Sequence, residues 1–110
     1  MDEKLGTVRI APGVLATIAY LTTLSVPGVV RMSHDLANSV SKLLRREGFA
    51  SGVKIQVRDE AVWVDLHVVV EAGVNMYQVG TQIQKEVREA IGNMVGMPVR
   101  EVNVYIQDVE

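Results

Sequence analysis

The stretch from Gly73 to Val109 constrains the fold more than any other part of the chain, because it combines one amphipathic helix with one alternating strand. Its apolar residues first recur at steps of three and four, which places them on one face of an α-helix. They are Met76, Val79, Ile83, Val87, Ala90, Ile91 and Met94. Apolar and polar residues then alternate, as in a strand with one buried face. The pattern predicts a helix over residues 76–95 and a strand over about 100–108.

Both ends of this helix carry signals of their own. Asn75 occupies the N-cap position, and Gln78 three residues later can complete a capping box. Gly96 and Pro98 are typical of the end of a helix. These residues all have a role in folding, and none is arranged for covalent chemistry.

The sequence before this long helix predicts alternating strands and helices, followed by a β-hairpin. Before the hairpin we expect a strand over 7–10, a helix from Pro12 to about Ser25, a strand over Val29–Met32, and a helix from Ser33 or Asp35 through Glu47. The first helix should bury Val14, Leu15, Ile18 and Leu21. In the hairpin, Val53–Arg58 alternates, Asp59-Glu60 makes the turn, and the next strand turns Val62, Val64, Leu66, Val68 and Val70 inward.

This order, β-α-β-α-β-β-α-β, predicts an α+β two-layer sandwich with a mixed β-sheet and helices packed mainly on one face. A chain of 110 residues forms one domain, which we take as residues 1–110. We expect one core containing Val62, Val64, Leu66, Val68, Ile83, Val87, Ile91, Val102, Val104 and Ile106.

The charge balance and the absence of cysteine limit the possible partners. The chain has 11 basic and 13 acidic side chains and a net charge of −2, so we expect no nucleic-acid partner and no electrostatic docking on an anionic membrane. It has no cysteine, which fits a reducing cytoplasm and leaves no thiolate for catalysis or zinc. Residues 1–6 are charged and lack the apolar core of a signal peptide, and the apolar runs of the chain are far shorter than the roughly 20 residues that span a bilayer. We therefore expect no direct membrane insertion.

Short motifs near both ends of the chain belong together as a family pattern. They are Gly6-Thr7-Val8-Arg9-Ile10, Ile18-Ala19 and Val26-Pro27-Gly28-Val29, then Val79, Ile83-Gln84, Val87, Gly96, Val99 and Val102-Asn103-Val104. With these motifs the chain resembles the bacterial alkaline-shock protein family, whose members are also called envelope-stress-response proteins. The resemblance runs from about Gly6 to Val109.

The resemblance implies a non-enzymatic bacterial scaffold that serves cell-envelope homeostasis or the envelope stress response through protein–protein contacts. It also implies a cytoplasmic homo-oligomer, which in some members is held at the membrane by an anchored protein partner. The alternative is a small-molecule or acyl-chain binding protein that regulates fatty-acid metabolism. Its ligand would lie between the helices and the sheet, in a cavity lined by Met76, Met94 and Met97.

Three groups of polar residues have the residue types of a metal, catalytic or phosphate-binding site but no further feature of one. They are the histidines His34 and His67, the carboxylates Asp59, Glu60, Asp65 and Glu71, and the basic residues Arg31, Lys42, Arg45 and Arg46. A metal site would need both histidines near a carboxylate, but we expect His67 on a strand and His34 in a loop, as two unrelated surface histidines. Turns and solvated strands collect acidic residues for other reasons. The basic residues have no interleaved aromatics and fit a solvated helix face. We expect no catalytic residue, no cofactor and no metal ion.

Large side chains on the polar side of the sheet form the best candidate site. Trp63, Asp65 and His67 alternate with the buried residues of their strand, and Val69 and Tyr105 share this parity. If helices cover only the other face, these side chains reach solvent, where exposed aromatics mark contact sites. The competing interpretation is that the N-terminal strand or the 48–52 loop covers them. The candidate interaction surface is Trp63, Asp65, His67 and Tyr105.

Overall fold

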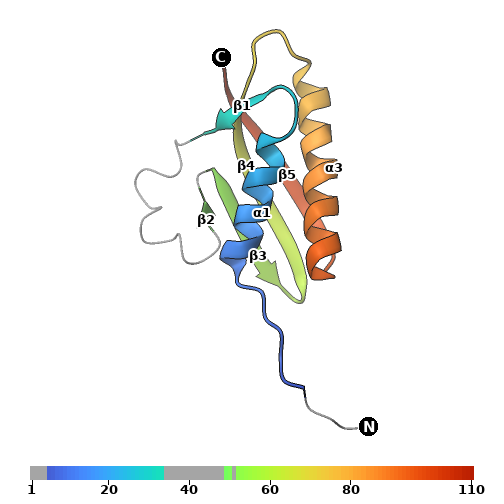
Figure 1. Cartoon of the computed structure of the whole chain (residues 1–110). Coiled ribbons are helices and arrows are strands. Elements are labelled where there is room, and N and C mark those ends of the chain that lie inside the picture. The colour runs from blue at the N-terminus through green and yellow to red at the C-terminus, as the bar shows by residue number, and fades with distance from the viewer. Residues whose placement is uncertain (1–4, 34–48, 51) are drawn as a thin grey trace.

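The computed structural model describes residues 5–33, 49–50 and 52–110, and in these ranges two helices cover one face of a five-stranded sheet (Figure 1). The elements are α1 (Pro12–Leu24), β1 (Val29–Met32), β2 (Phe49–Ala50), β3 (Val53–Arg58), β4 (Ala61–Val70), α3 (Met76–Val95) and β5 (Val99–Val109). The helices contact each other as well as the strands. The predicted α+β class, with a mixed sheet and helices on one face, is confirmed.

Strand β4 is the centre of the sheet. β5 runs parallel to it along nearly its whole length, whereas β3 is antiparallel to its first part and β1 is antiparallel to its end. Because β5 occupies one edge of β4, β1 and β3 share the other edge and lie end to end. β2 extends the sheet beyond β3.

Gly52 makes the junction between β1 and β3 possible. Its carbonyl accepts the His67 N–H at 2.8 Å, and the His67 carbonyl accepts the Ser33 N–H at 2.8 Å. A Cβ at Gly52 would lie 2.8 Å from the His67 oxygen and 2.9 Å from the Ser33 oxygen, and the residue has φ +75°. Only glycine fits so close to two backbone carbonyls in a left-handed conformation.

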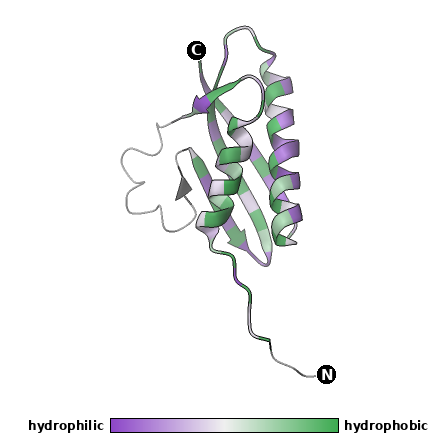
Figure 2. Ribbon diagram, viewed as in Figure 1, coloured by the Kyte–Doolittle hydropathy of each residue, from purple (hydrophilic) through white to green (hydrophobic). Residues whose placement is uncertain are grey.

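The core lies between α3, α1 and the inward side of β4. Val62, Val64, Leu66 and Val68 are 0% exposed, as are Ile83, Val87 and Ile91 of α3. Figure 2 shows α3 with hydrophilic residues along much of its visible outer side. The predicted bounds, the Asn75 N-cap and the Gly96 stop of this helix are confirmed: Asn75 Oδ1 accepts the Gln78 N–H at 3.0 Å, and Gly96 has φ 70°.

The predicted buried face of α1 was partly wrong. Val14 and Leu21 are 50% and 61% exposed, and the buried residues are Leu15, Ala16, Ala19 and Thr23. Small alanine side chains let the helix approach the sheet closely, and the Thr23 hydroxyl donates to the Ala19 carbonyl at 2.7 Å, so its burial leaves no unpaired polar group. Because α1 is apolar on most sides, its periodicity alone did not identify the packed face.

Two further predicted elements, one strand and one helix, are absent from the described part of the structure. Residues 5–11 belong to no helix or strand, so the strand predicted over 7–10 was wrong; Val8 is 92% exposed. A strand requires a neighbouring strand for its hydrogen bonds, and no described strand pairs with this segment. The helix predicted from Ser33 or Asp35 through Glu47 lies almost wholly outside the described residues.

Candidate interaction surface

The four residues of the predicted surface lie on the sheet face opposite the helices, which we call the outward face. Alternation along β4 sends Trp63, Asp65 and His67 to this face and the even-numbered residues into the core. The parallel register with β5 adds a cross-strand neighbour to each: Glu101 beside Trp63, Asn103 beside Asp65, and Tyr105 beside His67. The structure therefore brings the four predicted residues together.

His67 and Tyr105 form a stacked pair at the centre of the outward face. Their ring centroids are 4.7 Å apart and their planes differ by 15°. Burial lowers the pKa of His67 below its usual value of 6.5, and the nearby Asp65 carboxylate opposes this shift. His67 Nδ1 is shielded from solvent and has no hydrogen-bond partner among the described residues. The imidazole is therefore mainly uncharged at neutral pH.

The other two predicted residues are also held by neighbours. The Arg58 guanidinium lies over the Trp63 ring, 4.2 Å from its centroid, in a cation–π contact. Asn103 Nδ2 donates to Asp65 Oδ1 at 2.9 Å. Trp63, Asp65 and His67 are half-buried by these lateral contacts, whereas Tyr105 is 44% exposed. The surface is ordered by its own cross-strand pairs.

Val69 departs from the expectation that this side of β4 reaches solvent. It is 1% exposed, and its register partners are Arg31 on β1 and Asp108 on β5. The N-terminal segment is not the cover proposed in the competing interpretation for the outward face, because it borders a hollow with Val57 and Val95 on the helix side. The described outward face is therefore accessible at Tyr105 and partly at Trp63.

The polar groups considered as catalytic or metal sites do not assemble in the described residues. Asp59 and Glu60 form the β3–β4 turn, and Glu71 follows the far end of β4, about 33 Å away for a strand of this length. Arg31 pairs with Glu110 at 2.8 Å. His34, Lys42, Arg45 and Arg46 lie outside the described residues. In the ranges that the structure describes, no three His, Asp or Glu side chains gather as metal ligands would.

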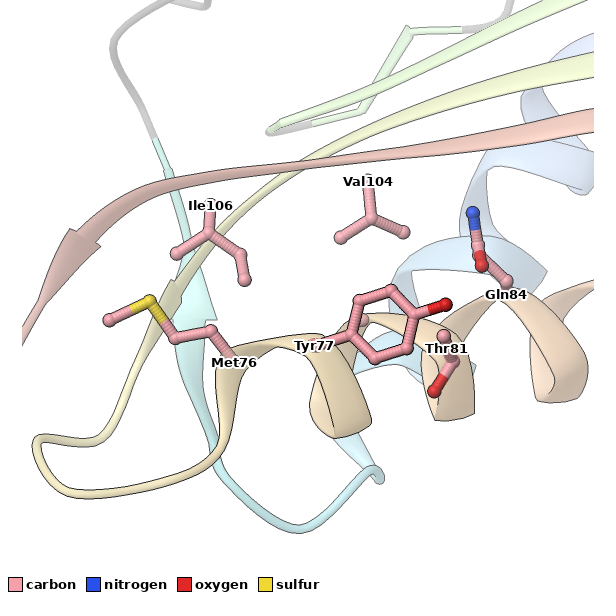
Figure 3. Close-up of a pocket in the computed structure, with 7 residues that line it drawn as sticks. Met76, Tyr77, Thr81, Gln84, Val104 and Ile106 are labelled. Atoms are coloured by element: carbon pink, nitrogen blue, oxygen red, sulfur yellow. The ribbon is translucent and has the colours of Figure 1, made fainter.

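A groove between α3 and β5 was missed by the sequence reasoning. It has a volume of about 360 Å³ and is lined by Met76, Tyr77, Gly80, Thr81, Gln84, Val104 and Ile106. Figure 3 shows Val104 and Ile106 of β5 directed toward Tyr77 and Met76 of α3. Val104 and Ile106 pack against the predicted core but are only partly buried, because small Gly80 and Thr81 leave this side of the helix open.

The methionines do not line the single cavity suggested by the sequence. Met76 borders the groove, Met97 borders a separate hollow near the N-terminal segment, and Met94 is 66% exposed. Among the described residues, no helix has the length and apolar content that crossing a membrane requires.

Known structures share this fold at low sequence identity. A MamM CTD variant superimposes with a TM-score of 0.54 at 14% identity, over 88% of this chain and 96% of that chain. This likeness supports the α+β architecture and nothing finer.

Two Bacillus subtilis proteins are similar along the whole chain. YqhY is 30% identical over 109 residues, which covers 99% of this chain and 81% of YqhY. YloU is 27% identical over 111 residues, which covers 99% of this chain and 92% of YloU. Residues 1–110 also match the model of an alkaline shock protein family described as having a cell envelope-related function, and the chain therefore belongs to that family.

Proposed function

We propose that the protein is a non-enzymatic interaction module that serves the bacterial cell envelope by binding protein partners, including copies of itself, through the outward face. The observation that carries this proposal is the contrast between the two sides of the sheet. One side is covered by α1 and α3, and the other presents Trp63 and Tyr105 with no helix over them among the described residues.

The contacts on the outward face favour binding because they limit the motion of its large side chains. Tyr105 is stacked on His67, and Trp63 is held under Arg58. Aromatic residues that are ordered before binding lose little conformational entropy when a partner covers them. Such residues frequently supply most of the affinity of an interface.

The polar groups of the outward face also have structural partners. Asp65 accepts from Asn103, and His67 stacks on Tyr105. These contacts explain the residues without a reaction, which supports a binding role over catalysis. The family supports the cellular setting of the proposal. A stress-response role, a cytoplasmic location and attachment to the membrane through an anchored partner belong to the same proposal.

Trp63→Ala tests the proposal. The side chain lies on the outward face, so the variant should remain folded and should lose affinity for its partner by about 2 kcal/mol or more. Binding would be measured by pull-down from membrane and soluble fractions of the bacterial host, and folding by circular dichroism. Met94→Ala is the matched control, because it removes an exposed apolar side chain from the opposite layer.

Two results would contradict the proposal. If the folded Trp63→Ala variant captures the same partners in the same amounts as the parent, the outward face is not the contact surface. If Met94→Ala reduces capture as much as Trp63→Ala, the loss is not specific to the outward face.

One observation favours the alternative of acyl-chain binding. The groove between α3 and β5 has an apolar lining in which Met76, Val104 and Ile106 take part. Calorimetric titration with a long-chain fatty acid would test it. Saturable binding that Gly80→Arg abolishes would support this alternative, and the absence of binding to the parent would reject it.

A further inference from the structure

The outer edge of β5 is an unpaired strand edge in the described structure. β5 has 11 residues and pairs only with β4 among the described strands. Free edges present N–H and C=O groups that can pair with another strand, and proteins commonly protect them with proline or lysine. Neither residue occurs between Val99 and Val109.

Side chains of α3 cover only the first part of this edge. Arg88 Nη1 donates to the Val99 carbonyl at 2.9 Å, and Gln84 Nε2 donates to the Val102 carbonyl at 3.0 Å. No described side chain bonds to a β5 carbonyl beyond Val102 in this way. Alternate residues of a strand direct their peptide groups to the same side, so Val104 and Ile106 continue the row that Val102 begins. The uncovered part of the edge therefore starts where the groove starts.

The groove lies where the side chains of an added strand would fall. Successive side chains of a strand point to opposite faces, so every second residue of a strand beside β5 would enter the helix layer. There it would meet Val104, Ile106 and Tyr77 (Figure 3). A Cβ at Gly80 would have no heavy atom within 4 Å, which leaves room on the α3 side. The groove thus fits the apolar residues of an alternating peptide.

The chain contains such a peptide in its N-terminal segment. Val8 and Ile10 alternate with Thr7 and Arg9, and both apolar side chains are exposed. The segment extends from the start of α1 away from the body of the protein (Figure 1). Its sequence predicts a strand, and the single domain contains no described partner for it.

This segment cannot reach the groove of its own chain. It borders a hollow with Val95, at the end of α3, whereas the groove is at the start of the same helix. From Val95 to Tyr77 the helix rises about 27 Å. Residues 7–11 span at most about 18 Å when fully extended. If this segment fills the groove, it therefore comes from another molecule.

We propose that residues 7–10 of a second copy add a strand to the free edge of β5 and place Val8 and Ile10 in the groove. This contact goes beyond the proposed function, because it gives a second mode of self-association that uses the strand edge and the groove and does not require the outward face. Reciprocal exchange closes a dimer, and head-to-tail exchange makes a longer assembly.

The charge of the segment agrees with this arrangement. With Val8 and Ile10 in the groove, Arg9 lies on the opposite side of the added strand, next to the outward face. There β5 presents Tyr105 and acidic Asp108. A guanidinium can stack on the tyrosine and interact with the carboxylate. An acyl chain would use the apolar groove but neither the backbone edge nor this charge.

Two pairs of variants test the contact by sedimentation velocity over a range of protein concentrations. Val8→Asp places a charge in the groove, and Gly80→Arg fills it. Leu5→Asp and Gly92→Arg are the matched controls, since Leu5 is as exposed as Val8 and a Cβ at Gly92 also meets open space. The parent and both controls should sediment at twice the 12.1 kDa chain mass or more, and both test variants at the single-chain mass.

A disulfide trap tests the same geometry directly, because the chain has no native cysteine. A mixture of Val8→Cys and Thr81→Cys proteins should form a covalent pair on mild oxidation. Val8→Cys mixed with Asn93→Cys should form much less, because Asn93 lies on α3 outside the groove.

The proposal is overturned if the parent is monomeric at all concentrations, if either Val8→Asp or Gly80→Arg keeps the parent mass, or if the trapped pair does not form. The outward face is tested separately. Loss of mass in Val8→Asp and Gly80→Arg, with capture of host partners unchanged in Trp63→Ala, supports the added strand and rejects the outward face. The opposite pattern rejects the added strand and leaves the outward face supported.

Discussion

The two faces of β4 are stabilised in different ways although their residues alternate along one strand. On the inward face Val62, Val64 and Leu66 are fully buried under the helices. On the outward face Asp65 and His67 are half-buried, by Asn103 and Tyr105 from the next strand. Burial of apolar area stabilises the first face, and pairwise cross-strand contacts stabilise the second.

This difference separates stability from recognition within one sheet. An apolar side chain in the core contributes through every neighbour that surrounds it, so its removal leaves a cavity. A cross-strand pair contributes roughly 0.2–1 kcal/mol, and its loss exposes groups that water can solvate. The outward face can therefore change with little effect on the fold, as a binding surface must.

Ile91→Ala should produce the largest loss of stability. Ile91 is 0% exposed, so its truncation should lower the free energy of unfolding by about 2–4 kcal/mol through lost burial and a residual cavity. Urea denaturation would measure the change. Met94→Ala on the exposed side of the same helix should change it by no more than about 0.5 kcal/mol. Equal effects would show that α3 does not separate a buried face from an exposed one.

Glu60→Gly should stabilise the protein by about 1 kcal/mol. Asp59 and Glu60 have φ 51° and 60° and form a two-residue turn between Arg58 and Ala61, which sets which residues of β3 and β4 share a face. A left-handed conformation costs a side-chain-bearing residue about 1 kcal/mol that glycine avoids. Thermal unfolding would measure the gain. Glu60→Ala retains the Cβ, and an equal gain in this control would reject the backbone explanation.

The Asp65–Asn103 pair should show a coupling energy of about 0.5–1 kcal/mol. The two side chains are joined by one hydrogen bond of 2.9 Å on the outward face. A double-mutant cycle with Asp65→Ala, Asn103→Ala and the double variant would measure it by chemical denaturation. Strict additivity would mean that the pair does not order this face.

The smallest effect should be the contribution of His67 to the pH dependence of stability. Burial lowers its pKa in the folded state below 6.5, so the unfolded chain binds the proton more tightly. Stability should therefore be full above about pH 6.5 and should fall as the pH is lowered through the folded-state pKa. Unfolding free energies of the parent and of His67→Phe, which can keep the aromatic stack, would isolate the effect. Increased parental stability on acidification relative to His67→Phe would contradict it.

The sequence predicted an element correctly where the signals for its two ends and its buried face lie within the element or next to it. α3 begins after Asn75 and ends at Gly96 as predicted, because the cap and the stop act within one helical turn. The parity of β4 and β5 likewise identified Trp63, Asp65, His67 and Tyr105 as one surface, because side chains alternate strictly along a strand. Whether that surface binds a partner stays a prediction.

Only the tertiary structure decided which neighbours each element receives. α1 is apolar nearly all round, and its close approach through Ala16 and Ala19 selected the buried face. The partial burial of Val104 and Ile106 was also decided by the tertiary structure, because it depends on how far α3 covers the edge strand β5. Residues 7–10 have the alternation of a strand but no described neighbouring strand. Alternation shows which side chains of a segment share a face, but it does not supply the second strand whose backbone must complete the hydrogen bonds.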